Sequence, residues 1–133
     1  MSKVFAVALV AVALIIGSAK YRRGRLEFSR SGGYSRITAA QAKALMDRDG
    51  VVIVDVRTPA EFAGAHIPGA INIPVETIGT VGPAPLADRD ATILLYCRSG
   101  ARSARAARRL LNLGYSTVHD FGGIISWPDE LVR

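Results

Sequence analysis

The chain has 133 residues, half of them hydrophobic, and a formal net charge of +6. This length holds one domain of about 100 residues and a short additional segment, with enough apolar sequence for a core without disulfides. The charge is uneven: residues 1–36 carry seven Lys and Arg against the single acid Glu27, whereas residues 37–133 carry ten basic and ten acidic side chains. This balance argues against a basic nucleic-acid-binding domain.

The beginning of the chain is predicted to be a separate module. "VFAVALVAVALII", residues 4–16, is unbroken apolar sequence, and residues 17–19 extend it to about 24 Å as a helix, slightly less than a ~30 Å hydrocarbon core. Four basic side chains follow within residues 20–25, and the positive-inside tendency keeps such a flank in the cytoplasm. We therefore predict that residues 1–19 are an uncleaved single-pass anchor, in the membrane through residues 4–19, with the folded domain in the cytoplasm.

Two alternatives remain for this segment. Small residues before Lys20 also suit a cleaved signal peptide, which would export the domain, and an apolar helix can be buried in a core. Residues 20–34 are predicted to be a basic juxtamembrane tether, because "SRSGGYS", 29–35, is rich in Ser and Gly. Residues 35–133 then form the domain.

From Ile37 onward, short apolar strands alternate with amphipathic helices. Thr38 and Gln41 have the spacing of a capping box and predict a helix over residues 39–47. The remaining predicted strands are 51–55, 70–74, 91–96 and 117–121, and the remaining predicted helices are a brief one from Pro59, 103–114, and a closing one over 124–132 interrupted by Pro128. The pattern indicates an α/β fold with a mainly parallel sheet.

Cys97 is the only cysteine and ends the predicted central strand, before the loop "RSGARS", 98–103. Ligand sites in open α/β sheets favour this edge. The small residues Ser99, Gly100 and Ala101 allow the backbone to curl, so that consecutive N–H groups and a helix N-terminus surround an anion. A Cys97 thiolate in that cradle would have a lowered pKa. The alternative is a buried cysteine that acts as a small hydrophobic residue.

Five arginines follow Cys97. Arg102, predicted to be still in the loop, is the best candidate for binding an incoming anion, and Arg98 is expected at the rim of the site. The other three, Arg105, Arg108 and Arg109, are predicted on a solvated helix face.

Three motifs, "DVRTPAEFAGAHIPGAINIP" (55–74), "LLYCRSGARS" (94–103) and "GYSTVHDFGGIISW" (114–127), resemble a single-domain rhodanese, a sulfurtransferase. The resemblance covers about residues 35–130 and implies a doubly wound α/β domain. It implies that Cys97 is the nucleophile and carries sulfur as a persulfide inside a substrate-binding loop, whose residues are Arg98, Ser99, Gly100, Ala101, Arg102 and Ser103.

The expected reaction moves sulfur from a small anionic donor, thiosulfate or a persulfide, through Cys97 to cyanide or a thiol. The donor or acceptor can also be a protein, and no cofactor is expected. Since no second cysteine can resolve the persulfide as an intramolecular disulfide, an external acceptor is required. Such covalent transfer in two steps gives ping-pong kinetics.

The upstream motif is expected to support this loop. The resemblance places Asp55 and Arg57 beside it, Asp55 orienting loop amides or an arginine rather than moving a proton. Arg57 and Glu61 are expected to form an ion pair, and His66 is implied to be structural.

Further along, His119 is expected to be partly exposed in its strand, and two separated histidines with one cysteine offer no persuasive metal-ligand set. Gly122 and Gly123 are expected to let the backbone approach the site, and Trp127 to pack the closing helix.

Two other functions remain as alternatives. Cysteine phosphatases and arsenate reductases use a related loop, but phosphatases place five residues between Cys and Arg, whereas four separate Cys97 from Arg102 here. A tighter ring of amides suits sulfur better than a phosphoryl group. The other alternative is a non-catalytic rhodanese-like binding module at the membrane, against which the intact Cys97 and Arg102 argue.

Overall fold

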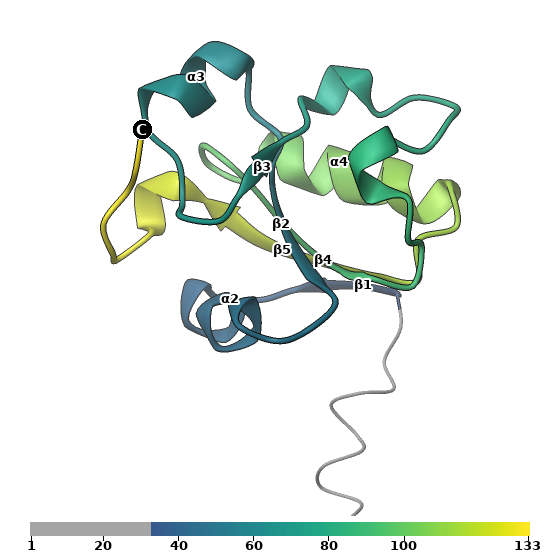
Figure 1. The fold of residues 1–133 in the computed structure, drawn as a ribbon, viewed down its shortest axis with the longest axis horizontal. Helices are drawn as coiled ribbons and strands as arrows, with labels where there is room; N and C mark the ends of the chain where they lie inside the picture. The colour runs from purple at the N-terminus through teal and green to yellow at the C-terminus, as the bar shows by residue number, and fades with distance from the viewer. Residues whose placement is uncertain (1–32) are drawn as a thin grey trace, which may run out of the picture. The chain divides into compact units, whose positions relative to one another are not determined.

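The computed structural model describes residues 33–133, so the predicted anchor and nearly all of the predicted tether lie outside the described residues. The described part contains a five-stranded sheet of order β1-β5-β4-β2-β3, in which every neighbouring pair is parallel (Figure 1). The strands are β1 Gly33–Arg36, β2 Val51–Asp55, β3 Ile71–Asn72, β4 Thr92–Cys97 and β5 Thr117–Gly123. All of them therefore direct their carboxyl ends to one edge.

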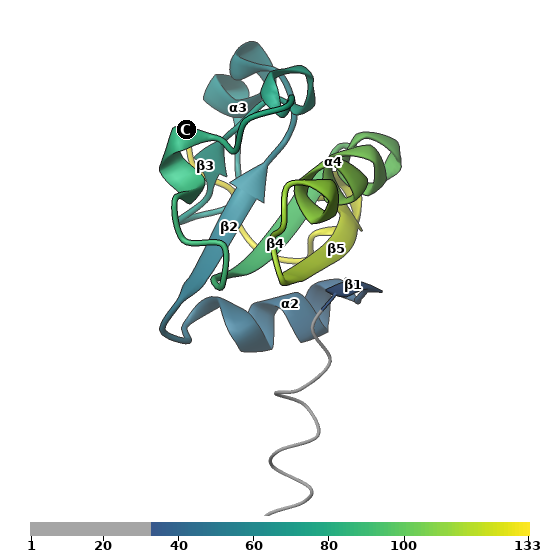
Figure 2. The ribbon, with the colours of Figure 1, turned by 90° about the vertical axis from the view of Figure 1, so that its right-hand side faces the viewer.

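Helices cover both faces of the sheet. Helix α2, Ala39–Met46, lies on one face and α4, Ala101–Asn112, on the other, while α3, Pro59–Gly64, follows β2 (Figures 1 and 2). Short 3₁₀ turns complete the fold: η2 Val75–Thr77, η3 Ala84–Leu86 and η4 Ile124–Ser126. The predicted α/β fold with a parallel sheet is confirmed. Within residues 33–133, no helix has the length and apolar character needed to cross a membrane.

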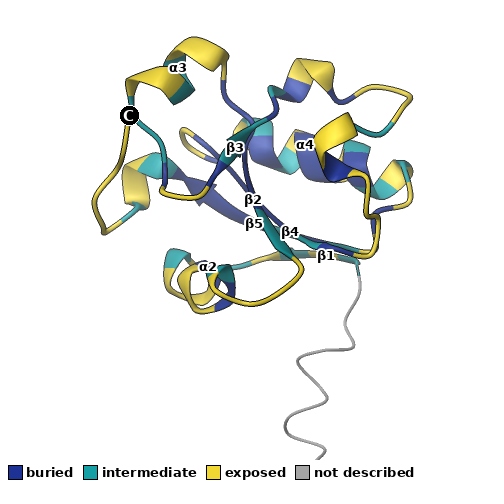
Figure 3. Cartoon of the chain, in the orientation of Figure 1, coloured by how far each residue is buried: buried dark blue, intermediate teal, exposed yellow. Residues whose placement is uncertain are grey.

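The core is divided by the sheet into two clusters. One contains Ala106, Ala107 and Leu110 of α4, and the other contains Ala42 and Leu45 of α2. Strand β4 contributes side chains to both clusters, because successive side chains of a strand point to opposite faces. Its residues 93–96 are fully buried. Figure 3 shows this burial concentrated in the central strands. The end of β4 is thus held rigidly.

Local sequence signals explain where the helices begin. The Thr38 side chain accepts a hydrogen bond from the Gln41 N–H, and the Gln41 side chain accepts one from the Thr38 N–H. The predicted capping box of α2 is therefore present. Thr58 and Glu61 form a second capping box at α3, with Pro59 in the first turn. Each box satisfies N–H groups that the helix itself leaves without partners.

Two boundaries differ from prediction because long-range contacts decide them. Residues 33 and 34 of the predicted tether and residues 35 and 36 of the predicted domain together form edge strand β1, since residues 33–36 pair with residues 117–120 of β5. Helix α4 begins at Ala101 and not at residue 103, because Gly100 has a φ of +112°, which lets the chain turn directly from the loop into the helix.

The predicted closing helix over residues 124–132 is wrong. Only the single turn η4 forms, because Pro128 lacks the N–H that a continuing helix needs. The chain then extends, and Val132 exchanges two backbone hydrogen bonds with His66, of 2.8 and 2.9 Å. This bridge ties the end of the described chain to the turn before β3.

Candidate active site around Cys97

Cys97 is the last residue of β4 and is 1 % exposed. It lies opposite Gly123 of β5, after an irregularity in register between Leu95 and Cys97. A Cβ on Gly123 would lie 2.1 Å from the carbonyl oxygen of Arg98. Only glycine therefore lets the loop after Cys97 rest on β5, which confirms the predicted close backbone approach for Gly123.

The loop surrounds the sulfur with donors. The Gly100 N–H donates to Cys97 Sγ over 3.0 Å, and the Ser103 Oγ lies 3.6 Å from it. Burial raises the pKa of the Cys97 thiol, but the hydrogen bonds that the sulfur forms with Ser103, through its side chain and its N–H, and with the N–H groups of Gly100 and Ser99 outweigh this effect, so the net pKa is lowered. The site therefore favours a nucleophilic thiolate.

The rim of this loop is open to solvent. Arg98, Ser99 and Ala101 are exposed, whereas Gly100 and Ser103 are buried beneath them. A small anion can thus approach from outside while the sulfur stays in a protected position.

Arg102 lies in a different element from the predicted one and has a carboxylate partner. It lies in the first turn of α4, and its two terminal nitrogens donate to the two carboxylate oxygens of Glu61, at 2.6 and 3.0 Å. The predicted Arg57–Glu61 ion pair is therefore wrong, because Glu61 pairs with Arg102. Hydrogen bonding by Arg102 is the main reason why the pKa of Glu61 falls to about 2.

Asp55 instead holds Arg57. Its carboxylate accepts the Arg57 backbone N–H at 2.9 Å and the guanidinium at 2.7 to 3.0 Å. Asp55 is fully buried and Arg57 is 6 % exposed. Arg57 also donates to the carbonyl of Ala65 at 2.7 Å, while Asn72 donates to the backbone carbonyls of both partners. The pair thus fixes the segment after β2.

The three later arginines do not share one environment. Arg108 is exposed, and Arg105 is exposed beside Glu76 at 3.9 Å. Arg109 is only partly exposed and donates to the backbone carbonyls of Val75, at 2.7 Å, and Ile78, at 3.3 Å. Its predicted place on the solvated face is wrong, because those carbonyls need a donor from α4.

Sequence reasoning missed Asp120, which is fully buried in β5. Its Oδ1 accepts the Ser103 hydroxyl at 2.7 Å and the Gly122 N–H at 2.9 Å, and its Oδ2 accepts Tyr34 at 3.5 Å. An acid inside an apolar strand such as "TVHDF" is the signal that could have identified it, since a buried carboxylate needs partners.

Both histidines have structural contacts. His66 Nδ1 lies 2.9 Å from the Phe62 carbonyl, and its ring stacks on Phe62 with a centroid separation of 3.8 Å. His119 is half-buried beside Ser35, and burial lowers its pKa. Among the residues that the structure describes, no group of three or more His, Cys, Asp or Glu side chains is arranged to hold a metal ion.

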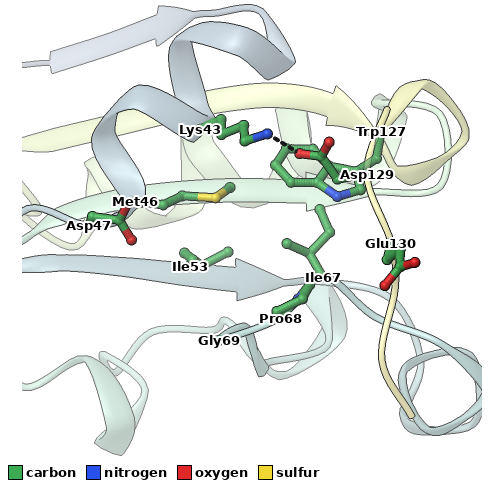
Figure 4. A pocket seen from close by; sticks show the side chains of 10 residues that line it. All are labelled: Lys43, Met46, Asp47, Ile53, Ile67, Pro68, Gly69, Trp127, Asp129 and Glu130. Carbon is green, nitrogen blue, oxygen red and sulfur yellow. Dashed lines mark ion pairs between the residues drawn. The ribbon is translucent and has the colours of Figure 1, made fainter.

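A cavity of about 320 Å³ lies on the α2 side of the sheet (Figure 4). Ile53, Ile67 and Trp127 line it, and the Lys43–Asp129 ion pair lies at its rim. These apolar residues belong to the α2 cluster, whereas Cys97 belongs to the α4 cluster, so this cavity is separate from the thiol. Trp127 packs against Phe121 at 5.9 Å between ring centroids and not against a closing helix.

Comparison with known proteins agrees with this geometry. The family model of the rhodanese-like domain matches residues 38–130. A sulfurtransferase from Allochromatium vinosum is 40 % identical over 89 residues, which are 65 % of this chain and 79 % of that protein. A thiosulfate sulfurtransferase from Pseudomonas putida is 36 % identical over 71 % of this chain and 84 % of that one. A rhodanese-related protein from Thermoplasma volcanium has a TM-score of 0.63 and 31 % identity, covering 74 % of this chain and 98 % of that structure.

Proposed function

The chain belongs to the family of rhodanese-like domains, and from that premise we propose that it is a sulfurtransferase in which Cys97 is the nucleophile. The observation that carries the proposal is the ring of N–H donors around Cys97 Sγ, closest at Gly100, at the carboxyl end of the central strand. Such a ring stabilises negative charge on sulfur before any substrate arrives.

The first step forms a persulfide. The Cys97 thiolate attacks the outer sulfur of thiosulfate or of a persulfide donor, a new S–S bond forms, and the donor's own S–S bond breaks. With thiosulfate, the bonding electrons leave on sulfite. The outer sulfur then remains on Cys97 inside the loop.

The second step discharges the persulfide. Cyanide or a thiolate attacks the outer sulfur, and the S–S bond to Cys97 breaks, returning the thiolate to the cradle of N–H groups. Because Cys97 is the chain's single cysteine, the acceptor comes from outside the chain. Two successive displacements predict ping-pong kinetics.

The donor is held at the exposed rim. Thiosulfate is a dianion, which exposed Arg98 and the loop N–H groups attract. Arg102 contributes even while paired, because a guanidinium has five N–H donors and the Glu61 pair uses two of them. Asp55 and Arg57 support the site by fixing the segment that leads to α3 and Glu61.

The test is thiocyanate formation from thiosulfate and cyanide by the full chain and by Cys97→Ser. Thiosulfate alone should add about 32 Da, one sulfur, to the wild type and nothing to the serine variant. Folded wild type that gains no sulfur from thiosulfate or from a low-molecular-weight persulfide would refute the proposal and favour a binding module. Hydrolysis of a phosphate ester by wild type alone would instead favour phosphatase chemistry.

We also propose that residues 4–19 anchor the chain in a membrane with the domain in the cytoplasm. The support is the apolar run and the basic side chains that follow it. Protease treatment of intact and permeabilised cells tests both parts. Protection of the domain until the membrane is permeabilised is the expected result, and a shortened, exported product would show cleavage instead.

A further inference from the structure

Ser103 has one hydroxyl hydrogen and two anionic groups near it. Its Oγ lies 2.7 Å from Asp120 Oδ1 and 3.6 Å from Cys97 Sγ. A hydroxyl donates one hydrogen and accepts others. The shorter contact places that hydrogen on the Asp120 side, so the Cys97 thiol donates to Ser103 and receives nothing from it.

All three groups are almost entirely buried. Cys97 is 1 % exposed, and Ser103 and Asp120 are fully buried. The two contacts limit the separation of Sγ from Oδ1 to about 6 Å, a range in which a like charge opposes ionisation. Asp120 therefore affects the ionisation of Cys97 in two ways. Its negative charge opposes the thiolate, and its Oδ1 accepts the hydrogen bond of the Ser103 hydroxyl.

We propose that Asp120 is a positioning residue that tunes the nucleophile: its carboxylate keeps the Ser103 hydroxyl away from Cys97 and so prevents the loop from over-stabilising the thiolate. This inference rests on the proposed sulfurtransferase function. The benefit follows from thiol chemistry, because a thiolate loses nucleophilicity as its pKa falls, and the best attacking thiol has a pKa near the ambient pH. The N–H groups of Ser103, Gly100 and Ser99 lower the Cys97 pKa, as does hydrogen bonding at the Ser103 side chain; by holding that hydroxyl, Asp120 limits the second contribution.

The other groups that face Asp120 do not replace Ser103. From β1, Tyr34 donates to Oδ2 at 3.5 Å and is 46 % exposed. The Nη2 of Arg36, also from β1, would lie 3.0 Å from a Cβ built on Gly100 and 3.8 Å from one built on Gly122, so this cation faces the loop and the end of β5. On β5 the neighbouring His119 contacts Ser35. None of these hydrogen bonds joins Asp120 to the sulfur.

The test measures the rate of Cys97 alkylation by iodoacetamide against pH in the full chain, followed by intact mass. It needs no sulfur donor, so its result is independent of the sulfurtransferase assay. In Asp120→Asn the midpoint should fall by about one pH unit, because a like charge is lost and the Ser103 hydroxyl is released. The rate on the high-pH plateau should then fall by about threefold for each unit.

A second variant distinguishes this arrangement from ordinary serine support of the thiolate. Ser103→Ala should move the midpoint little in the wild type, because the hydroxyl is held by Asp120, and should raise it by about one unit in the Asp120→Asn background. The proposal can be tested even if Asp120→Asn does not fold. A large rise of the alkylation midpoint in the single Ser103→Ala variant would by itself overturn it.

Asp129→Asn is the matched control, since that exposed carboxylate pairs with Lys43 at the rim of the separate cavity. Its midpoint should equal that of wild type. An Asp120→Asn midpoint that is unchanged or higher, with only the urea stability reduced, would show that Asp120 merely holds the loop and would overturn the inference.

Discussion

Two arginine–carboxylate pairs among the described residues have the same bidentate chemistry and differ in burial, so they test what burial contributes. Both are bidentate, but Arg57–Asp55 has side chains 8 and 0 % exposed, whereas Arg102–Glu61 has side chains 27 and 32 % exposed. Asp55→Asn leaves a desolvated guanidinium without its counter-charge and should cost about 3–5 kcal/mol of unfolding free energy. Glu61→Gln should cost less than about 1 kcal/mol, because water and salt screen that pair.

Urea unfolding of the full chain, followed by the fluorescence of its single tryptophan, Trp127, measures both costs. With an m-value of about 2 kcal/mol per molar urea, Asp55→Asn should lower the midpoint by about 2 M and Glu61→Gln by less than about 0.5 M. Replacing Arg57 by Met in the Asp55→Asn chain should recover much of the loss, since the uncompensated charge is then removed. Equal shifts for the two single variants would refute the reasoning.

Three further results are expected. Gly123→Ala should slow persulfide formation at least tenfold and destabilise the fold, because the new Cβ would lie 2.1 Å from the loop backbone. Single-turnover mass analysis measures the first effect and urea unfolding the second. Wild-type values in both assays would contradict this prediction. Arg109→Ala should cost about 1.5–3 kcal/mol, since two carbonyls of residues 75–78 lose a charged donor, whereas exposed Arg108→Ala should change unfolding by less than about 0.5 kcal/mol. Arg102 lowers the folded pKa of Glu61 below its ordinary 4.5, so the stabilisation from this pair should be complete above pH 4.5 and be lost as pH falls through the folded pKa; carboxyl NMR titration measures the midpoint, and a value at or above 4.5 would contradict the ion pair.

Features set by neighbouring residues could be predicted from the sequence. The Thr38–Gln41 spacing identified α2, short apolar runs identified β2 and β4, and the position of Cys97 before a glycine-containing loop placed the thiol at the carboxyl edge of the sheet. The Thr58–Glu61 spacing carries the same capping signal for α3, in addition to that of Pro59. Local patterns suffice where the hydrogen bonds they predict are local.

Features set by distant residues could not be predicted in this way. Glu61 lies near Arg57 in sequence but pairs with Arg102, 41 positions away. Strand β1 pairs with a strand 84 positions later, and its glycine-rich sequence resembles a linker. Asp120 acquires its role from Ser103 on another element. Each depends on how the sheet and α4 bring separate segments together, which no spacing along the chain expresses.

The sheet order has a consequence for how the domain is made during translation. Among the described strands, β1 is synthesised first and pairs only with β5, which is synthesised last and enters between β1 and β4. The loop after Cys97 also rests on Gly123 of β5. A nascent chain in which Cys97 has already emerged from the ribosome therefore lacks the surface that shapes the loop until β5 has emerged as well. The sulfur remains an ordinary thiol during synthesis and acquires its reactivity only when the domain closes.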